Sequence, residues 1–543
     1  MVEGRSYEGL RFWALFLAGL SFTDLAALLV VVVLHAANPL NVYVDALYPL
    51  FYIFAGSMIA AAVLVVFWFA LRYPQHRRTL VVLMLITTGL LIAHFYTINS
   101  PPTASCFDSS KEVDGCVMDE IYYVPAAQTL LQGDKCGPYG TNCNLEHPFL
   151  SKAFIAAGIV LFGNNDFGWR FFTVLLGTAC IPVLFGVCWR FSKDSTLSLF
   201  ASFLLAFETL FFVHSSIAVI DVQAVFFALL AFLVYICDFR LWKLNRFVLA
   251  GILLGLSALC KETAVFLLFF LAVYHLFLGR GSKKLRLAGS AGTFAVAVVV
   301  FAAGLQVYVM LFGAPDVHSF IDDVRYILSY GSGLKGVGWT DAVFGTPITP
   351  FNWMTYFSAV GYFITRVLSN GVPQYISLGY WGTPSFFEIW LTYLWVPYVL
   401  YLTIRRWRTS RMSAMIPQPT AEPGTNLSLD DAPLFRETPS LAAMQALEAS
   451  SEGTFRLGWF ALLWFVMTYF PYFALYYYGR VTYPFYLVPA MPAIAIGSAF
   501  VLSRKWFPRE VAYILLGGVF LWFFLYYPDK SFLPTWLRMI MGH

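Results

Sequence analysis

Long apolar runs, separated by short polar segments, recur along almost the whole chain. Runs of this length can cross a bilayer as helices, which satisfy their own backbone hydrogen bonds in lipid. They lack the alternation of apolar and polar residues that a membrane β-barrel requires. The pattern therefore predicts an all-α polytopic membrane protein with about 13 transmembrane helices. The runs lie at residues 12–35, 48–71, 79–98, 168–189, 196–213, 218–238, 247–260, 263–279, 287–313, 386–404, 457–474, 481–503 and 511–527.

The composition excludes a soluble protein of this size. Hydrophobic residues make up 59% of the 543 residues, and charged residues only 12%. Too little polar surface is left to cover a core in water. The net charge of +4 does not indicate a nucleic-acid partner, because most basic residues lie where they mark membrane topology. Membrane lipids are the surroundings that this composition predicts.

Basic residues predict which side of the membrane each loop faces. Cytoplasmic loops are enriched in Lys and Arg, and the loop 36–47 has neither. We therefore expect a cytoplasmic N-terminus and, with an odd number of spans, a C-terminus on the outer side. The loops that are then cytoplasmic and basic include residues 72–78, 190–193, 240–246, 280–286, 405–411 and 504–509.

The spans divide the chain into a core and several appended segments. The second outer segment is rich in aromatic, Gly and Pro residues, which predicts an irregular loop with short interfacial helices. The cytoplasmic insert is rich in Pro, Ser, Thr and Glu, which predicts a disordered connector with a short helix near Leu441–Ala449. The expected segments are two extra N-terminal helices (1–78), a central module (79–313) with a first outer loop (99–167), a second outer loop (314–385), one helix (386–404), the insert (405–456), and C-terminal helices with an outer tail (457–543).

Four of the eight cysteines lie in the first outer loop. On an oxidising side of the membrane they predict two disulfides, Cys106–Cys116 and Cys136–Cys143, if nearest neighbours pair. A zinc site made of the same four thiolates is the alternative, although their spacing is not that of paired CxxC motifs.

Two adjacent carboxylates, Asp119 and Glu120, are the first candidates for chemistry. A carboxylate on the membrane surface can act as a general base that takes a proton from an incoming hydroxyl. The alternative is a solvated pair at the start of a short interfacial helix, where acidic residues are favoured.

The same loop ends in Glu-His-Pro-Phe-Leu-Ser-Lys, residues 146–152. His147 and Lys152 would lie at the start of an amphipathic helix through Phe149–Phe162, along the membrane surface, with its N-terminus facing an anion. The alternative is a His-Pro turn followed by a lysine that snorkels to the interface.

Further charges lie near the predicted outer ends of spans. Such groups usually face a polar cavity and a partner, because charge is costly in lipid. Arg170 and Arg480 could bind a lipid phosphate bidentately, although each could equally anchor a span at the interface. The other charged or titratable residues of this set are Asp221, Lys261, Glu262, Glu208 and His214.

These residues come in an order that resembles a known family. Asp119-Glu120, the stretch 146–152, Phe-Gly-Trp-Arg at 167–170 and Ser-Ile-Ala-Val-Ile-Asp at 216–221 resemble the dolichyl-phosphate-mannose protein O-mannosyltransferases, membrane glycosyltransferases of the C-type fold. The family pattern His-Pro-Pro-Leu-Gly-Lys is altered here, since Phe149 and Ser151 replace Pro and Gly. The second outer loop is too short for the MIR domain of eukaryotic members, so the chain resembles a prokaryotic, archaeal-like member.

The resemblance implies an inverting transfer of a hexose, with mannose expected, from a polyprenyl or dolichyl phosphate to Ser/Thr hydroxyls of proteins. By analogy Asp119 is the base, and Glu120 orients the acceptor or the sugar. The resemblance implies no metal and no other cofactor. It leaves open whether the protein works as a dimer, and whether such a dimer is a homodimer or a heterodimer. The residues expected to hold the donor phosphate and sugar are His147, Lys152, Arg170, Asp221 and Arg480.

Two other functions remain open at this point. A related C-type enzyme that glycosylates a lipid or a lipid-linked oligosaccharide would carry the same donor-binding residues. A transporter could also use charges near span ends, but internal repeats and pairs of Gly/Pro-broken spans are missing.

Overall fold

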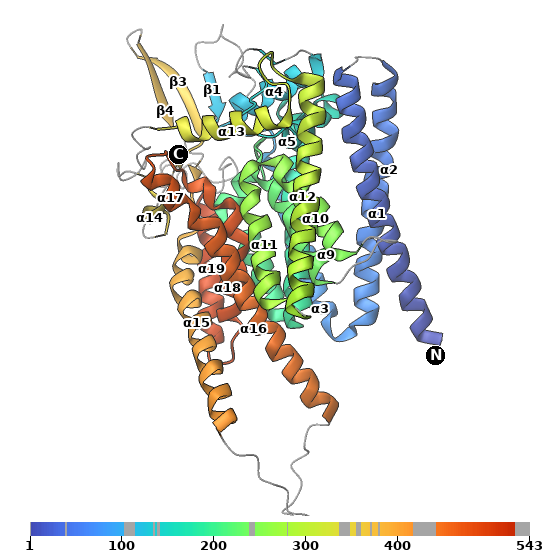
Figure 1. Ribbon diagram of the computed structural model, residues 1–543, viewed down its shortest axis with the longest axis vertical. Helices are drawn as coiled ribbons and strands as arrows, with labels where there is room; N and C mark the ends of the chain where they lie inside the picture. Colours follow the sequence, from blue (N-terminus) through green and yellow to red (C-terminus); the bar gives the residue numbers. More distant parts are fainter. Residues whose placement is uncertain are drawn as a thin grey trace, which may run out of the picture.

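The structure is a computed structural model, and it describes residues 2–37, 41–101, 114–133, 136–137, 142–237, 245–279, 281–335, 348–354, 360–369, 372–377, 381–415 and 441–526. Helices dominate it and run side by side as a bundle (Figure 1). Strands and short helices gather at one end of this bundle.

The chain begins with a helical hairpin at one edge of the bundle, made of α1 (Val2–Ala37) and α2 (Asn41–Arg72) (Figure 1). The two helices are joined by a buried hydrogen bond between the hydroxyls of Ser21 and Ser57, at 2.8 Å. A short η1 (Pro74–His76) leads into α3 (Arg77–Thr97). This hairpin corresponds to the two extra N-terminal helices that the sequence predicts.

The middle of the chain forms the part of the bundle that carries the candidate site. Its long helices are α6 (Asp166–Ser192) and α12 (Lys283–Phe312). The shorter elements around them are α4 (Glu120–Gln132), α5 (Leu150–Phe162), α7 (Ser195–Ala206), α8 (Thr209–His214), α9 (Asp221–Ile236), α10 (Arg246–Cys260), η4 (Glu262–Ala264) and α11 (Val265–Leu278).

The C-terminal helices pack against this middle part, and two of them extend well beyond the bundle (Figure 1). These two are α15 (Phe386–Met415) and α16 (Leu441–Tyr469). Helix covers 405–415, where the sequence predicted a disordered connector, and it covers 441–456, where the sequence predicted a short helix near Leu441–Ala449. Residues 416–440 lie outside the described residues. The remaining elements are α17 (Pro471–Tyr477), η5 (Pro484–Ala490), α18 (Met491–Leu502) and α19 (Arg509–Tyr526).

The helical bundle agrees with the all-α prediction, and two small sheets accompany it. β1 (Asp114–Val117) pairs antiparallel with β3 (Phe363–Ser369), which pairs with β4 (Val372–Ser377), in the order β1-β3-β4. β1 belongs to the first outer loop and the other two strands to the second, so this sheet joins the two loops. Their pairing depends on residues about 250 positions apart, which local sequence patterns do not reveal. A second sheet pairs β2 (Val360–Gly361) with β5 (Trp381–Gly382).

The second outer loop also contains α14 (Pro350–Trp353) and α13 (Phe320–Gly333), which lies across the end of the bundle (Figure 1). α13 begins with a capping box formed by Ser319 and Asp322, a device that satisfies otherwise unpaired N–H groups at a helix start. The prediction of short helices in this loop is confirmed, but it missed the strands.

Within the described residues, nine helices are long and apolar enough to cross a membrane, against the thirteen spans predicted. The protein is thus a multi-pass membrane protein with fewer full-length helices than expected. The apolar windows at 196–213, 218–238, 247–260 and 263–279 instead form helices of 10–17 residues or shorter. Charged residues cause these interruptions: Glu208 caps α8, Asp221 starts α9, and Lys261 ends α10.

The close approach of α5 and α6 gives a first prediction. A Cβ atom on Gly158 would lie 2.0 Å from the backbone oxygen of Gly168, which cannot move without shifting α6. We expect Gly158→Ala to lower the free energy of unfolding by about 1–3 kcal/mol, as overpacking does. The thermal unfolding midpoint in detergent measures this. Gly89→Ala in α3 is the matched control, because nothing lies within 4 Å of its added methyl; an equal loss in both variants would contradict the prediction.

Candidate active site

Asp119 lies where the first outer loop turns into helix α4. Met118 has a φ of 38°, a left-handed conformation that is costly outside glycine. It turns the chain from β1 into α4, and Asp119 becomes the residue before the first helical turn. The backbone N–H of Met118 donates to the carbonyl of Tyr362, at 2.7 Å. The second outer loop therefore helps to hold the turn that places Asp119.

The carboxylate of Asp119 has no hydrogen-bond partner in the part of the chain that the structure describes, and it makes no capping bond to α4. Burial raises the pKa of Asp119 above its ordinary value, while the nearby Lys261 and His147 act in the opposite direction. An unpaired carboxylate between cationic groups has its lone pairs available for an incoming hydroxyl.

Glu120 is bound quite differently, by Arg170 of α6. Two parallel bonds, Nε to Oε1 and Nη2 to Oε2, are both 2.8 Å long, and both side chains are fully buried. The backbone N–H of Ala218 donates to the same carboxylate at 2.6 Å. Glu120 therefore has a structural partner on each side, in contrast to Asp119.

The guanidinium of Arg170 is fully engaged within the protein. Besides Glu120, it donates to the carbonyl oxygens of Ile98, at 2.7 Å, and Pro101, at 3.0 Å. These contacts favour a structural role for Arg170, and its binding of the donor phosphate stays a prediction. It joins the end of α3, the start of α4, α6 and the turn before α9.

Lys152 has a similar internal role. Its ammonium donates to the carbonyls of Cys143, Asn144 and His147, at 2.9, 2.6 and 2.8 Å. All three of its hydrogens are thereby used, and the side chain is 1% exposed. Lys152 thus holds the loop that carries His147, and its contact with the phosphate stays a prediction.

A disulfide between Cys136 and Cys143 closes the same loop. This bond confirms one of the two predicted pairings and excludes a zinc site that uses all four thiolates. Cys106 lies outside the described residues, and so does the side chain of Cys116, together with their predicted bond.

His147 pairs with a residue that the site prediction omitted, Glu262. Its Nδ1 lies 2.8 Å from Oε2 of Glu262, and its ring lies 5.8 Å from the ring of Tyr123 between centroids. The neighbouring Lys261 forms an ion pair with Asp221. Adjacent charges between two apolar windows were the sequence signal for this pair.

The carboxylate of Asp221 lies beside two basic side chains, those of Lys261 and His214. Besides Lys261, it lies 3.3 Å from Nδ1 of His214, whose Nε2 lies 2.7 Å from the hydroxyl of Tyr362. Lys261 also lies 5.7 Å from the ring centroid of Phe485. The sequence analysis did not identify Tyr362 as a neighbour of His214, because the two residues are 148 positions apart and Tyr362 lies in the second outer loop.

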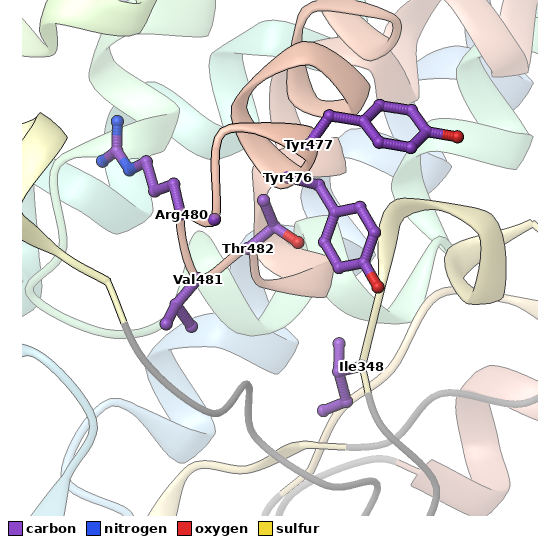
Figure 2. A pocket seen from close by; sticks show the side chains of 7 residues that line it. Ile348, Tyr476, Tyr477, Arg480, Val481 and Thr482 are labelled. Atoms are coloured by element: carbon purple, nitrogen blue, oxygen red, sulfur yellow. The ribbon is translucent and has the colours of Figure 1, made fainter.

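Arg480 borders a cavity of about 360 Å³ between the second outer loop and the segment after α17. Figure 2 shows its side chain extending away from Tyr476 and Tyr477. Its buried Nε has no hydrogen-bond partner among the described residues. The Arg480 guanidinium is also an electrostatic neighbour of the Tyr486 hydroxyl, and the ring of Tyr486 in turn lies 5.8 Å from Nζ of Lys261. Of the two arginines among the predicted phosphate ligands, Arg480 is the one with a guanidinium nitrogen that has no hydrogen-bond partner among the described residues. The cavity is lined by Ile348, Tyr476, Tyr477, Gly479, Arg480, Val481 and Thr482.

Part of the chain is similar to a known protein family. Residues 146–305 match the sequence model of the dolichyl-phosphate-mannose-protein mannosyltransferases. Asp119 and Glu120 lie outside the matched residues, so their assignment depends on the geometry described above.

Two mycobacterial proteins are similar in sequence, and both are polyprenol-phosphate-mannose–protein mannosyltransferases. The one from Mycolicibacterium smegmatis is 26% identical over 227 residues, which are 37% of this chain and 42% of the relative. The one from Mycobacterium tuberculosis is 30% identical over 185 residues, 28% of this chain and 34% of the relative. The similarity thus spans less than half the length of these relatives.

The fold is shared with a solved enzyme. The Saccharomyces cerevisiae protein O-mannosyltransferase Pmt1–Pmt2 complex, bound to the sugar donor, superposes with a TM-score of 0.58 at 10% identity. The match covers 83% of this chain and 90% of that chain. This superposition confirms the C-type glycosyltransferase fold that the sequence analysis predicts.

The contacts of Arg170 give a second prediction, which separates a structural role from phosphate binding. Arg170→Met leaves Glu120 buried without its counter-charge, and we expect a loss of about 3–5 kcal/mol in stability. Unfolding of the purified protein measures it, and the double variant Glu120→Gln/Arg170→Met should recover part of the loss. If stability is unchanged while binding of polyprenyl phosphate is lost, Arg170 is a phosphate ligand after all.

Proposed function

We propose that the protein is an inverting glycosyltransferase that moves a hexose, mannose in the first instance, from a polyprenyl phosphate to Ser/Thr hydroxyls of proteins. The observation that carries this proposal is the difference between two adjacent carboxylates. Asp119 is unpaired among cationic groups, while Glu120 is bound to Arg170 and Ala218. A single available base is what this reaction needs.

The chemistry explains why one carboxylate is enough. The acceptor hydroxyl attacks the anomeric carbon and gives its proton to Asp119. The bond from that carbon to the phosphate oxygen breaks, and its electron pair leaves with the phosphate. The phosphate leaves without a proton, so the second carboxyl group of a glycosidase, which protonates the leaving oxygen, is not required.

Lys261 and Arg480 are the cations that we assign to the leaving phosphate. Preorganised positive charge stabilises the charge that develops on the leaving group. Lys261 is held by Asp221 and faces the rings of Phe485 and Tyr486. Asp221 thereby takes part in donor binding indirectly, as the residue that positions Lys261. The names of the mycobacterial relatives, which contain polyprenol-phosphate-mannose, support this class of donor.

We also propose that the site faces the outer side of the membrane. The start of α1 and the far ends of α15 and α16 lie at one end of the bundle, while α4, α13 and the sheet lie at the other (Figure 1). The N-terminus and the basic segment 405–411 would then share the cytoplasmic side. The site would be extracytoplasmic, beside the disulfide Cys136–Cys143.

The third prediction tests the proposed base. Purified protein in detergent is given radiolabelled polyprenyl-phosphate mannose, with a Ser/Thr-rich peptide and a lipid extract as separate acceptors. We expect label on the peptide, and a fall of about 10²–10⁴-fold in Asp119→Asn, as for loss of a general base. Asp316→Asn, an exposed carboxylate near the end of α12, is the control.

Each other result of this experiment has a clear meaning. Label in the lipid extract alone would replace the protein acceptor by a lipid acceptor, with the same donor chemistry. Transfer to neither acceptor by the wild type would contradict the proposed function. Full activity of Asp119→Asn would remove Asp119 from the role of base.

The fourth prediction concerns the donor phosphate. Lys261→Met removes a cation from the site, and we expect the Kd for polyprenyl phosphate to rise about tenfold, the value of one charge-assisted hydrogen bond. Pairing it with Asp221→Asn avoids leaving a buried carboxylate alone. Lys335→Met, an exposed lysine, should bind like the wild type. Unchanged affinity in the Lys261 variants would contradict the assignment.

A further inference from the structure

The cavity of about 360 Å³ beside Arg480 has a wall made mostly of rings and aliphatic groups. Tyr476 and Tyr477 come from the end of α17, and Ile348 comes from the second outer loop. The cavity therefore lies between two segments that are far apart in the chain. Arg480 is the one charged residue among the described residues that line it.

Thr482 places a polar group without a partner in the wall of this cavity. The residue is 1% exposed, and its hydroxyl has no hydrogen-bond partner among the described residues. Figure 2 shows this hydroxyl directed toward the ring of Tyr476, with Ile348 facing the same space. Buried hydroxyls are nearly always hydrogen-bonded, because an unpaired one has lost its water without compensation. A ligand that offers Thr482 a hydrogen-bonding atom would supply what is missing.

The backbone holds this wall in place. Gly479 has a φ of 81°, a left-handed conformation that glycine adopts without strain, and it turns the chain at the end of α17. Beyond the turn, the N–H of Val481 donates to the carbonyl of Leu334, at 3.0 Å. Arg480 also forms an isolated antiparallel bridge with Lys335. The cavity is therefore preformed, as small binding sites usually are.

Arg480 connects the cavity with the reaction centre. Its Nη1 lies against α13, 3.2 Å from where a Cβ atom on Gly331 would be. Its guanidinium and the carboxylate of Asp119 are both electrostatic neighbours of the Tyr486 hydroxyl. The ring of Tyr486 lies 5.8 Å from Nζ of Lys261. The cavity therefore borders the reaction centre, and Arg480 belongs to both.

We propose that this cavity binds a residue of the acceptor peptide that flanks the glycosylated Ser or Thr. The apolar side chain of that residue packs on the ring of Tyr476 and on Ile348, and its main-chain carbonyl accepts a hydrogen bond from the hydroxyl of Thr482. This inference rests on the proposed function and deepens it, because it names the part of the protein that selects the acceptor sequence.

The chemistry of the cavity fits a peptide better than either part of the donor. A polyprenyl chain has no polar atom and would leave the hydroxyl of Thr482 unpaired. The hexose is bonded directly to the phosphate, so it has to lie with the phosphate at Asp119 and Lys261. Each residue of a peptide offers a carbonyl together with its side chain. An extended peptide also advances about 3.3–3.6 Å per residue, so residues that flank the acceptor hydroxyl extend beyond the reaction centre.

The fifth prediction compares two acceptor peptides of equal length, each with a single Thr. One has Pro and Val around the Thr, and the other has Gly at the same positions. We expect the wild type to show a KM about tenfold lower for the first peptide, because that peptide buries apolar surface in the cavity. Tyr476→Ala should largely abolish this difference with little change in kcat. Thr482→Val should raise KM about fivefold for both peptides, the value of one neutral hydrogen bond.

The controls separate a peptide subsite from damage to the fold or to the reaction centre. Tyr478→Ala is the matched control, because Tyr478 is 82% exposed and lies outside the cavity wall; it should act like the wild type. Thr482→Val removes a hydroxyl that is already unpaired, so the thermal unfolding midpoint should not fall. N-acetyl-threonine amide has no flanking residue, and every variant should glycosylate it like the wild type. The Kd for polyprenyl phosphate should also be unchanged.

The negative outcomes can be told apart. If the wild type glycosylates both peptides with one KM, and Tyr476→Ala and Thr482→Val do the same, the acceptor role of the cavity is overturned and the proposed function stands. It is also overturned if the variants lose affinity for polyprenyl phosphate at unchanged peptide KM, or lose as much with N-acetyl-threonine amide as with the peptides. If the wild type transfers to no acceptor, the proposed function fails and this inference fails with it.

Discussion

The buried ion pair between Glu120 and Arg170 is the interaction on which the rest of the site depends. Its two charges lie where water does not reach, so each needs the other and further hydrogen bonds to be tolerated. Ile98, Pro101 and Ala218 supply those bonds. Four separate parts of the chain are therefore held at one point. Asp119 is the residue before Glu120 in the chain. Its backbone is therefore positioned by the contacts of Glu120, while its own side chain makes no capping bond to α4.

Breaks in the apolar helices supply the remaining functional groups. A continuous helix in lipid uses its own backbone bonds and presents apolar side chains. At the end of α8, the start of α9 and the end of α10, the chain instead places polar side chains at the candidate site. These side chains are His214, Asp221, Lys261 and Glu262. The same interruptions separate the short helices that stand where four spans were predicted. The departure from the expected number of spans and the construction of the site thus have one physical cause.

The two outer loops act together, although the sequence separates them widely. Tyr362 donates or accepts through its hydroxyl at His214, and its carbonyl accepts from Met118 beside Asp119. The sheet β1-β3-β4 joins the same two loops. Any movement of the second outer loop would therefore reach both Asp119, the proposed base, and the cluster of Asp221, His214 and Lys261.

The sequence by itself predicted the membrane class, the helical hairpin at the start, and the pairing of Cys136 with Cys143. These follow from hydropathy, from loop composition and from short sequence distance, which are local properties. It also named Asp119 and Glu120, and gave them different roles only through the family resemblance. Their different contacts appear only in the tertiary structure, because the partners of Glu120 lie 50 and 98 residues away in the chain. The tertiary structure likewise shows that Lys152 and Arg170 donate hydrogen bonds to backbone carbonyls of the protein, and that Glu262 pairs with His147. The sequence pattern around a charged residue is the same whether its side chain binds a ligand or a backbone carbonyl of its own chain. Which of the two partners it has depends on the tertiary structure.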